Sequence, residues 1–276
     1  MGNNELPFLH SLQYHFVIKH RNFLMLELIQ SFGMTGTEWT ISLACGFLVG
    51  MTKAGLGGVY LMMVPLMAIV FGGKPSTGII LPILIVADLY AVKHYNRHAD
   101  WGYILKVTPW AVVGVLIGSQ VGNSISDEIF KSLLSILVLV GIVMMVWIDL
   151  KKVETVPDYW WFAMILGLLG GFSSMIGNAA GPILALYLLS MRIPKYSFIG
   201  TTAWFFLLIN LIKIPLHVYS WNTITLETLY FTLILSPVII LGVFVGIQIV
   251  KIIPEKLYRI LVISTVVIPS LVLLYR

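Results

Sequence analysis

The chain has 276 residues, of which 59% are hydrophobic and 11% are charged, and its mean hydropathy is +0.96. This composition excludes a soluble globular domain, and apolar runs of about 18 residues or more recur from end to end, which predicts a polytopic helical membrane protein. The formal net charge of +5 would favour a nucleic acid partner in a soluble protein, but here we assign the basic residues to membrane topology and lipid headgroups and expect no nucleic acid partner.

The first 34 residues form an N-terminal segment of their own. Their apolar residues recur near helical spacing among several basic residues, which favours a segment lying along the membrane interface over a cleavable signal. Apolar segments then run approximately over residues 39–50, 59–72, 76–95, 103–122, 130–149, 159–172, 182–191, 197–216, 226–250 and 257–275. We therefore expect an all-α polytopic membrane protein with about 8–10 transmembrane or re-entrant helices.

A glycine-rich break separates the first two apolar segments. It has four glycines in the nine residues from Gly50 to Gly58, and each glycine costs a helix roughly 1 kcal/mol relative to alanine. Unwound backbone at membrane depth persists only where it is buried in protein or lines a wet cavity. Lys53, inside the break, costs roughly 2.5 to 3.5 kcal/mol at that depth and needs an anionic or hydrogen-bonding partner. We interpret the break as half of a binding site.

A second break, from Gly170 to Pro182, divides the sixth and seventh segments. Short hydrophobic segments interrupted by glycine at corresponding places in two halves are typical of transporter sites. The end of each half supports an internal repeat, since four residues recur at a constant offset of 128 (237 − 109): Pro109, Gly114, Gly118 and Gln120 match Pro237, Gly242, Gly246 and Gln248. Earlier in the halves, an offset of 122 relates Gly78 and Asp88 to Gly200 and Asn210.

These matches predict the domain organisation. Residues 35–149 form a first transmembrane repeat, residues 150–158 a charged linker, and residues 159–276 a second transmembrane repeat. If each half crosses the membrane an odd number of times, the two repeats are inverted. Loops on the cytoplasmic side usually carry more Lys and Arg than loops on the other side. Whether each broken pair crosses the membrane once or twice changes which loops share a side, so both orientations of the termini stay open.

Several polar residues inside apolar segments are candidates for the pathway. Asp88 is the one acidic residue well inside an apolar run, so we expect it either to pair with Lys53, in a functional or a purely structural role, or to carry a coupling proton. Asn210 either lines the pathway or links two helices by a hydrogen bond. The remaining candidates either face the cavity, or lie on packing faces and at helix ends where long side chains snorkel: Gln120, Gln248, Lys213 and His217.

An anion is the ligand that the two breaks suit. The second break supplies hydroxyl and amide groups that replace a ligand's lost water, and each break is followed by a helix start with free N–H groups and a partial positive charge. We therefore assign substrate binding to Lys53, Gly55, Gly57, Gly58, Ser173, Ser174, Asn178 and Gly181. No metal-spaced His and Cys set, nucleophile elbow or complete phosphate loop is present, so we expect no enzyme activity, no metal and no cofactor.

An ordered set of motifs resembles the TauE/SafE sulfite exporter family of membrane transporters over nearly all of residues 39–275. It comprises Gly46-x-x-x-Gly50-x-x-Lys53-x-Gly55-x-Gly57-Gly58, then Pro65, Ala87-Asp88, Tyr95 and Asp100-Trp101, and the Gly-x-x-x-Gly helices in both halves. The resemblance implies export of small anions, including sulfite and organosulfonates, across the inner cell membrane.

The working hypothesis is a secondary transporter in which a small anion binds near the midplane between the repeats. Asp88 would set the charge of Lys53 or exchange a proton, and one repeat would move against the other. The alternatives are a channel-like anion pore, an ion-coupled carrier of a different small organic solute, a cation carrier, and an intramembrane enzyme or sensor subunit. Lys53 disfavours the cation carrier, and the missing catalytic and output motifs disfavour the last two. We assign no oligomeric state.

Overall fold

The computed structural model describes residues 30, 32–56, 63–133, 136, 137, 140, 143, 159–254 and 257. The chain divides into two compact units, Met1–Thr40 and Ile41–Arg276. Helix α2 (Gly36–Lys53) begins in the first unit with a capping box. There Glu38 Oε2 accepts from the backbone N–H of Thr35 at 2.7 Å, while Thr35 Oγ1 accepts from that of Glu38 at 3.3 Å. The two side chains thus satisfy N–H groups that have no partner within the helix.

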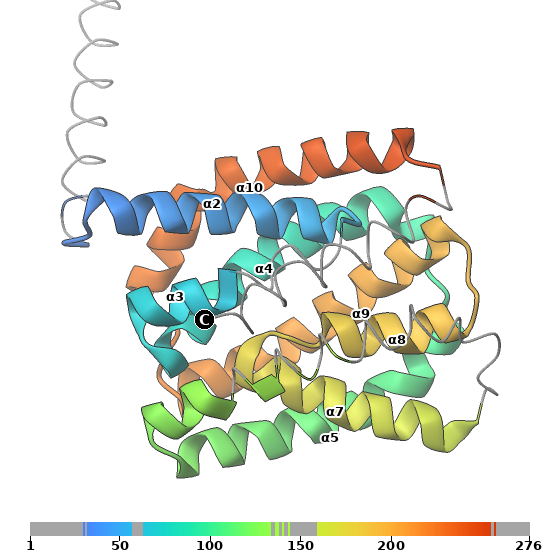
Figure 1. Ribbon diagram of the computed structural model, residues 1–276, viewed down its shortest axis with the longest axis horizontal. Helices are drawn as coiled ribbons and strands as arrows, with labels where there is room; N and C mark the ends of the chain where they lie inside the picture. Colours follow the sequence, from blue (N-terminus) through green and yellow to red (C-terminus); the bar gives the residue numbers. More distant parts are fainter. Residues whose placement is uncertain are drawn as a thin grey trace, which may run out of the picture. The chain divides into compact units, whose positions relative to one another are not determined.

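The described part of the second unit is helical and contains no strand, which confirms the all-α prediction (Figure 1). After α2 its elements are α3 (Met63–Phe71), α4 (Gly73–Tyr95), a short 3-10 turn (Asn96–His98), α5 (Trp101–Ser124), α7 (Trp160–Gly177), α8 (Gly181–Ser190), α9 (Lys195–Pro215), a π-helical turn (Leu216–Ser220) and α10 (Leu226–Ile252).

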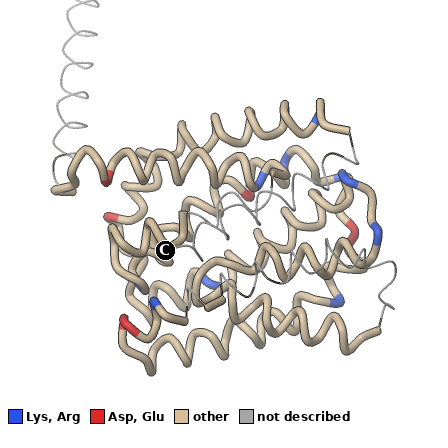
Figure 2. The backbone as a smooth tube through the Cα atoms, in the orientation of Figure 1, with Lys and Arg blue, Asp and Glu red and all other residues tan. Residues whose placement is uncertain are grey.

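Five of the described helices are long and apolar enough to cross a membrane. These spans are Gly73–His98, Trp101–Ser124, Trp160–Gly177, Lys195–Ser220 and Leu226–Ile252, and α8 is a shorter apolar helix. Charged residues are sparse along the helical backbone (Figure 2). The prediction of a polytopic helical membrane protein is therefore confirmed.

Helices α2 and α7 end in different ways. At the end of α2, the N–H of Leu56 donates to the carbonyl of Met51 and that of Gly55 to Thr52, which is a Schellman motif. It requires a left-handed residue, and Gly55 supplies it with φ of +119°. Helix α7 ends at Gly177, and the left-handed residue that follows it is an asparagine, Asn178 with φ of 53°; α8 begins three residues later at Gly181.

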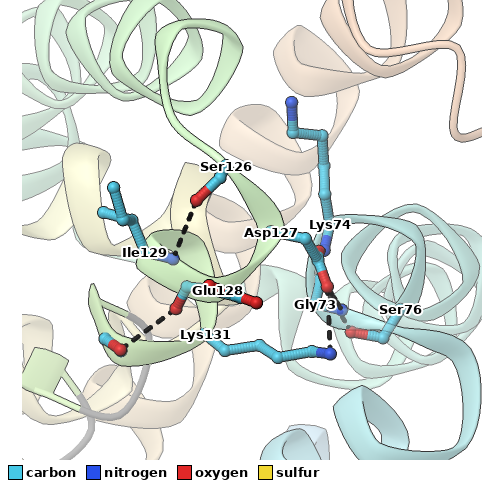
Figure 3. A network of polar contacts seen from close by, with 9 residues as sticks. Gly73, Lys74, Ser76, Ser126, Asp127, Glu128, Ile129 and Lys131 are labelled. Atoms are coloured by element: carbon cyan, nitrogen blue, oxygen red, sulfur yellow. Dashed lines mark hydrogen bonds and ion pairs between the residues drawn. The ribbon is translucent and has the colours of Figure 1, made fainter.

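The start of α4 is held by Asp127, as Figure 3 shows. Its carboxylate accepts from the backbone N–H groups of Gly73 at 3.3 Å and Lys74 at 3.1 Å, and it lies 3.0 Å from the ammonium of Lys131. A negative charge at a helix start complements the partial positive charge of the exposed N–H groups. This contact fixes the beginning of the helix that carries Asp88 in its buried middle.

Helices α5 and α7 approach closely through glycine. A Cβ added to Gly171 would overlap the carbonyl oxygen of Ala111, and one added to Gly114 would overlap that of Leu168. Such small-residue contacts allow two helix backbones to pack tightly in a membrane.

Helices α2 and α10 meet in the same way. A Cβ on Gly50 would overlap the carbonyl oxygen of Ile239, and one on Gly242 would overlap that of Phe47. The α2 positions differ from the α7 positions by 121 (171 − 50 and 168 − 47), and the α5 positions differ from the α10 positions by 128 (239 − 111 and 242 − 114). The two helix pairs therefore use corresponding residues. Between them, α4 packs along α9.

Candidate functional site

The side chain of Lys53, the last residue of α2, contacts the buried middle of α4. Lys53 Nζ lies 2.9 Å from Asp88 Oδ1, and the two side chains are 8% and 0% exposed. The same ammonium lies 4.0 Å from the centre of the Phe206 ring, on α9. A lysine in such surroundings needs a charged or π-electron partner, and Lys53 has both. The expected pairing of Lys53 with Asp88 is therefore present in the structure.

The other oxygen of the same carboxylate connects α4 to α9. Asn210 Nδ2 donates to Asp88 Oδ2 at 2.7 Å, so the two residues that the sequence matched at an offset of 122 are in direct contact. The other polar atom of the same amide, Asn210 Oδ1, accepts from Lys213 Nζ at 3.2 Å.

Lys213 is fully buried on α9 and connects the network to the end of α7. Besides Asn210, its ammonium donates to Ser174 Oγ at 3.3 Å and to Asn178 Oδ1. The amide of Asn178 is oriented by a second bond, since its Nδ2 donates to the carbonyl of Thr77 at 3.2 Å. The three acceptors of Lys213 are thus all neutral oxygens.

The resulting polar network runs from Lys53 through Asp88, Asn210 and Lys213 to Ser174 and Asn178. It joins α2, α4, α7 and α9 inside the unit. With all groups ionised, the network holds two ammonium groups and one carboxylate, an excess of one positive charge. A buried charge without a counter-charge is expensive, so the excess favours binding of one negative charge.

Two hydroxyl groups next to the network are buried and have no hydrogen-bond partner among the described residues. They are Thr52 Oγ1, one residue before Lys53, and Ser173 Oγ, one residue before Ser174. Buried polar atoms in folded proteins normally have partners. Each helix end thus carries one buried hydroxyl whose hydrogen-bonding capacity no described residue uses.

The predicted glycine positions have mixed outcomes. Gly55 shapes the end of α2, and a Cβ there would meet Ile199 at 2.8 Å. Gly181 begins α8, a helix start with no side-chain cap, and a Cβ there would meet nothing within 4 Å. Gly57 and Gly58 lie outside the described residues.

Gln120 and Gln248 stand apart from the network. Both side chains belong to exposed residues, on α5 and α10 respectively. The structure therefore does not bring them together with Lys53, Asp88 and Asn210.

The sequence interpretation left two roles open for Lys213, a place in the pathway or snorkelling from a helix end. The structure excludes snorkelling, because the side chain is 0% exposed. The helix continues past it through Pro215 into the π-helical turn. The useful signal was its position three residues after Asn210, which puts both side chains on one helix face.

A network that links four helices around excess positive charge is consistent with a membrane transporter of anions, since five helices in the described part of the chain are long and apolar enough to cross a membrane. The family model described as sulfite exporter TauE/SafE matches residues 42–273. The chain belongs to the TauE/SafE family. This is a family of membrane transporters and not of enzymes, which confirms the predictions of transport and of no enzyme activity. Neither a curated protein nor a solved structure was found to match the chain.

Proposed function

We propose that this TauE/SafE family member is a secondary transporter that moves a small anion, sulfite or another sulfur-containing anion such as an organosulfonate, across the inner cell membrane. The observation that carries the proposal is the buried network with two lysine side chains and one aspartate. Family membership supports transport, and the excess positive charge supports an anionic substrate.

The substrate site in this proposal lies where the ends of α2 and α7 meet the network. Lys53 supplies charge, Asp88 holds its ammonium in place, and Asn210 transmits the orientation of that carboxylate to Lys213. The unpaired hydroxyl of Ser173 and the uncapped start of α8 at Gly181 add neutral donors. Gly57 and Gly58, which lie outside the described residues, stay predicted substrate-binding positions. We leave Gln120 and Gln248 out of the site because they are exposed.

We also propose that residues 35–149 and 159–276 are inverted repeats, each with a broken helix. The glycine contacts support this, because α2 packs on α10 through the residues that correspond to those joining α7 and α5. Alternating access around a fixed site is the mechanism that such repeats usually provide.

The test is anion flux in proteoliposomes with purified protein. Uptake of radiolabelled sulfite, sulfoacetate, thiosulfate and chloride is compared with and without an imposed pH gradient. We expect saturable flux of at least one sulfur-containing anion, and counterflow against the same anion inside the vesicle. Counterflow separates a carrier from a channel-like pore, since a pore gives no exchange of this kind.

The site is tested by Lys53→Met, which removes the charge and keeps most of the side-chain volume. Lys93→Met, at an exposed position on α4, is the matched control. We expect flux to fall by about 100-fold or more in Lys53→Met, the cost of about 3 kcal/mol of lost charge-assisted binding, and to stay near the wild-type rate in the control. Equal flux in both variants would contradict the site, and no saturable flux of any sulfur-containing anion would contradict the function.

A further inference from the structure

Lys213 differs from Lys53 in one respect that bears on mechanism. Lys53 contacts a carboxylate directly at 2.9 Å, whereas the three acceptors of Lys213 are all uncharged. Asp88 is the carboxylate of the network, and Lys53 already occupies one of its two oxygens. The second ammonium is therefore the group whose charge lacks a counter-charge in the described part of the chain. In a buried site such a group is neutral unless an anion accompanies it.

The surroundings of Lys213 satisfy its nitrogen in either protonation state. Both asparagine oxygens must accept, because the Nδ2 groups of Asn178 and Asn210 are committed to the Thr77 carbonyl and to Asp88. The hydroxyl of Ser174 is different, since it both donates and accepts. An ammonium donates to all three partners. A neutral amine donates to the two asparagines and accepts the Ser174 hydrogen with its lone pair.

We propose that Lys213 is the coupling-proton site of the transporter: it is neutral in the empty site and takes up one proton when one monovalent anion binds. This inference rests on the proposed function and assigns its coupling ion. In the binding step a proton from solvent joins the lone pair of Lys213 Nζ, the Ser174 hydroxyl turns from donor to acceptor, and the anion enters beside the new ammonium. The network then has zero net charge both when empty and when loaded.

Two charged groups among the described residues act on Lys213: Lys53 on α2 and Asp88 on α4. Its hydrogen-bond partners at the end of α7, Ser174 and the C-cap residue Asn178, are neutral. In the π-helical turn that follows α9, His217 lies four residues after Lys213; it is buried, its Nδ1 lies 2.8 Å from Thr223 Oγ1, and its Nε2 has no partner among the described residues. His217 is therefore the competing proton carrier, and the experiment must separate the two.

The direct test is proton uptake during binding to purified protein in weakly buffered detergent solution. The probe is isethionate, a sulfonate whose single negative charge does not titrate in the assay range. A pH indicator reports protons and calorimetry reports bound anion. We expect about one proton taken up for each anion bound, because the excess charge is one. Anion binding without proton uptake would overturn the proposal.

Two substitutions locate the proton. Lys213→Arg carries a permanent charge, so it should bind isethionate without proton uptake. His217→Gln removes the competing titratable group and should keep the wild-type proton count. Lys93→Arg, an exposed change of the same kind, is the control and should also match wild type. Wild-type proton uptake in Lys213→Arg, or its loss in His217→Gln, would overturn the assignment to Lys213.

A second test uses the wild-type protein in proteoliposomes, so it does not depend on whether the variants fold. Electroneutral symport of one proton with one isethionate should be insensitive to a potassium diffusion potential, and a pH difference of about one unit should balance an anion gradient of about tenfold. Isethionate flux that follows voltage would overturn the inference and leave the proposed function standing. No saturable flux of isethionate or of the other sulfur-containing anions would overturn both.

Discussion

The ends of α2 and α7 make similar close contacts with a neighbouring helix, but their polar side chains differ. Gly50 and Gly171 bring these helices into backbone contact with α10 and α5 at corresponding positions. Three residues later, at the same offset of 121 (174 − 53), one helix presents Lys53 and the other Ser174. On the helices that face them, Asp88 of α4 contacts Asn210 of α9. The two helix ends thus share backbone contacts at a constant sequence offset and differ in charge, so the side chains, and not the backbone contacts, set the charge of the network.

The largest expected effect comes from moving the carboxylate from one half to the other. Asp88→Asn leaves Lys53 buried without its counter-charge, which should lower the free energy of unfolding by about 3 to 5 kcal/mol. Adding Asn210→Asp restores a carboxylate to the network beside Lys213, and we expect it to recover part of the loss. Thermal unfolding of the detergent-purified variants measures both changes. If the double variant is no more stable than Asp88→Asn, the two halves do not share one electrostatic network.

The next effect tests whether the two scaffolds are equivalent. Gly171→Ala and Gly50→Ala each place a methyl group against a carbonyl oxygen of the facing helix, and each should cost about 3 kcal/mol of stability because neither backbone can give way locally. Gly170→Ala is the matched control, since its Cβ would first meet a side-chain atom of Ile183 at 3.5 Å. Thermal unfolding in detergent should show similar losses for Gly50→Ala and Gly171→Ala and little change for the control. A large loss in only one of the two would break the correspondence between the helix pairs.

The smallest effect concerns the starts of α4 and α9. Asp127 holds the start of α4, whereas the start of α9 at Lys195 has no side-chain cap. Partial burial opposes ionisation of Asp127, but the backbone N–H groups of Lys74 and Gly73 and the Lys131 ammonium together hold its pKa below the ordinary aspartate value. A lowered folded-state pKa means that the carboxylate stabilises the fold above the unfolded-state value of about 3.9 and that this stabilisation disappears as pH falls through the folded-state pKa.

Asp127→Asn should therefore cost about 1 kcal/mol or less at neutral pH, because the side chain is half exposed, and should remove this part of the acid sensitivity. Unfolding temperatures of wild type and variant measured from neutral pH down to about 3 provide the test. The two curves should converge at low pH. Parallel curves would show that Asp127 does not contribute to the pH dependence.

The sequence singled out Lys53 and Asp88 clearly, but it left the role of Lys213 open. Lys53 and Asp88 stand out because charged residues are costly inside apolar segments. Lys213 does not stand out, since apolar segment boundaries carry an error of a few residues and a lysine near a boundary normally snorkels. The deciding fact is that α9 continues into the π-helical turn after Pro215, and a hydropathy pattern does not show such an extension.

For the two glutamines, in contrast, helical geometry applied to the sequence was enough to predict that they point away from the glycine contacts. Gln120 follows Gly118 by two residues, which is about 200° around an α-helix at 3.6 residues per turn. Since Gly114 and Gly118 face α7, Gln120 must point away from that contact, and its exposure agrees. The same spacing separates Gly246 from Gln248. Matching polar residues in two halves therefore indicate a repeated helix face, and that face need not line the pathway.

The glycine contacts also restrict which helices can move relative to one another. Each tight pair combines one helix from each half, α2 with α10 and α7 with α5, at backbone-to-backbone distance. Swinging residues 35–149 as one piece against residues 159–276 would pull both pairs apart. A movement that preserves these contacts must therefore carry α2 together with α10, and α5 together with α7. In each close helix pair, the glycines of a helix from one half pack against the backbone of a helix from the other half.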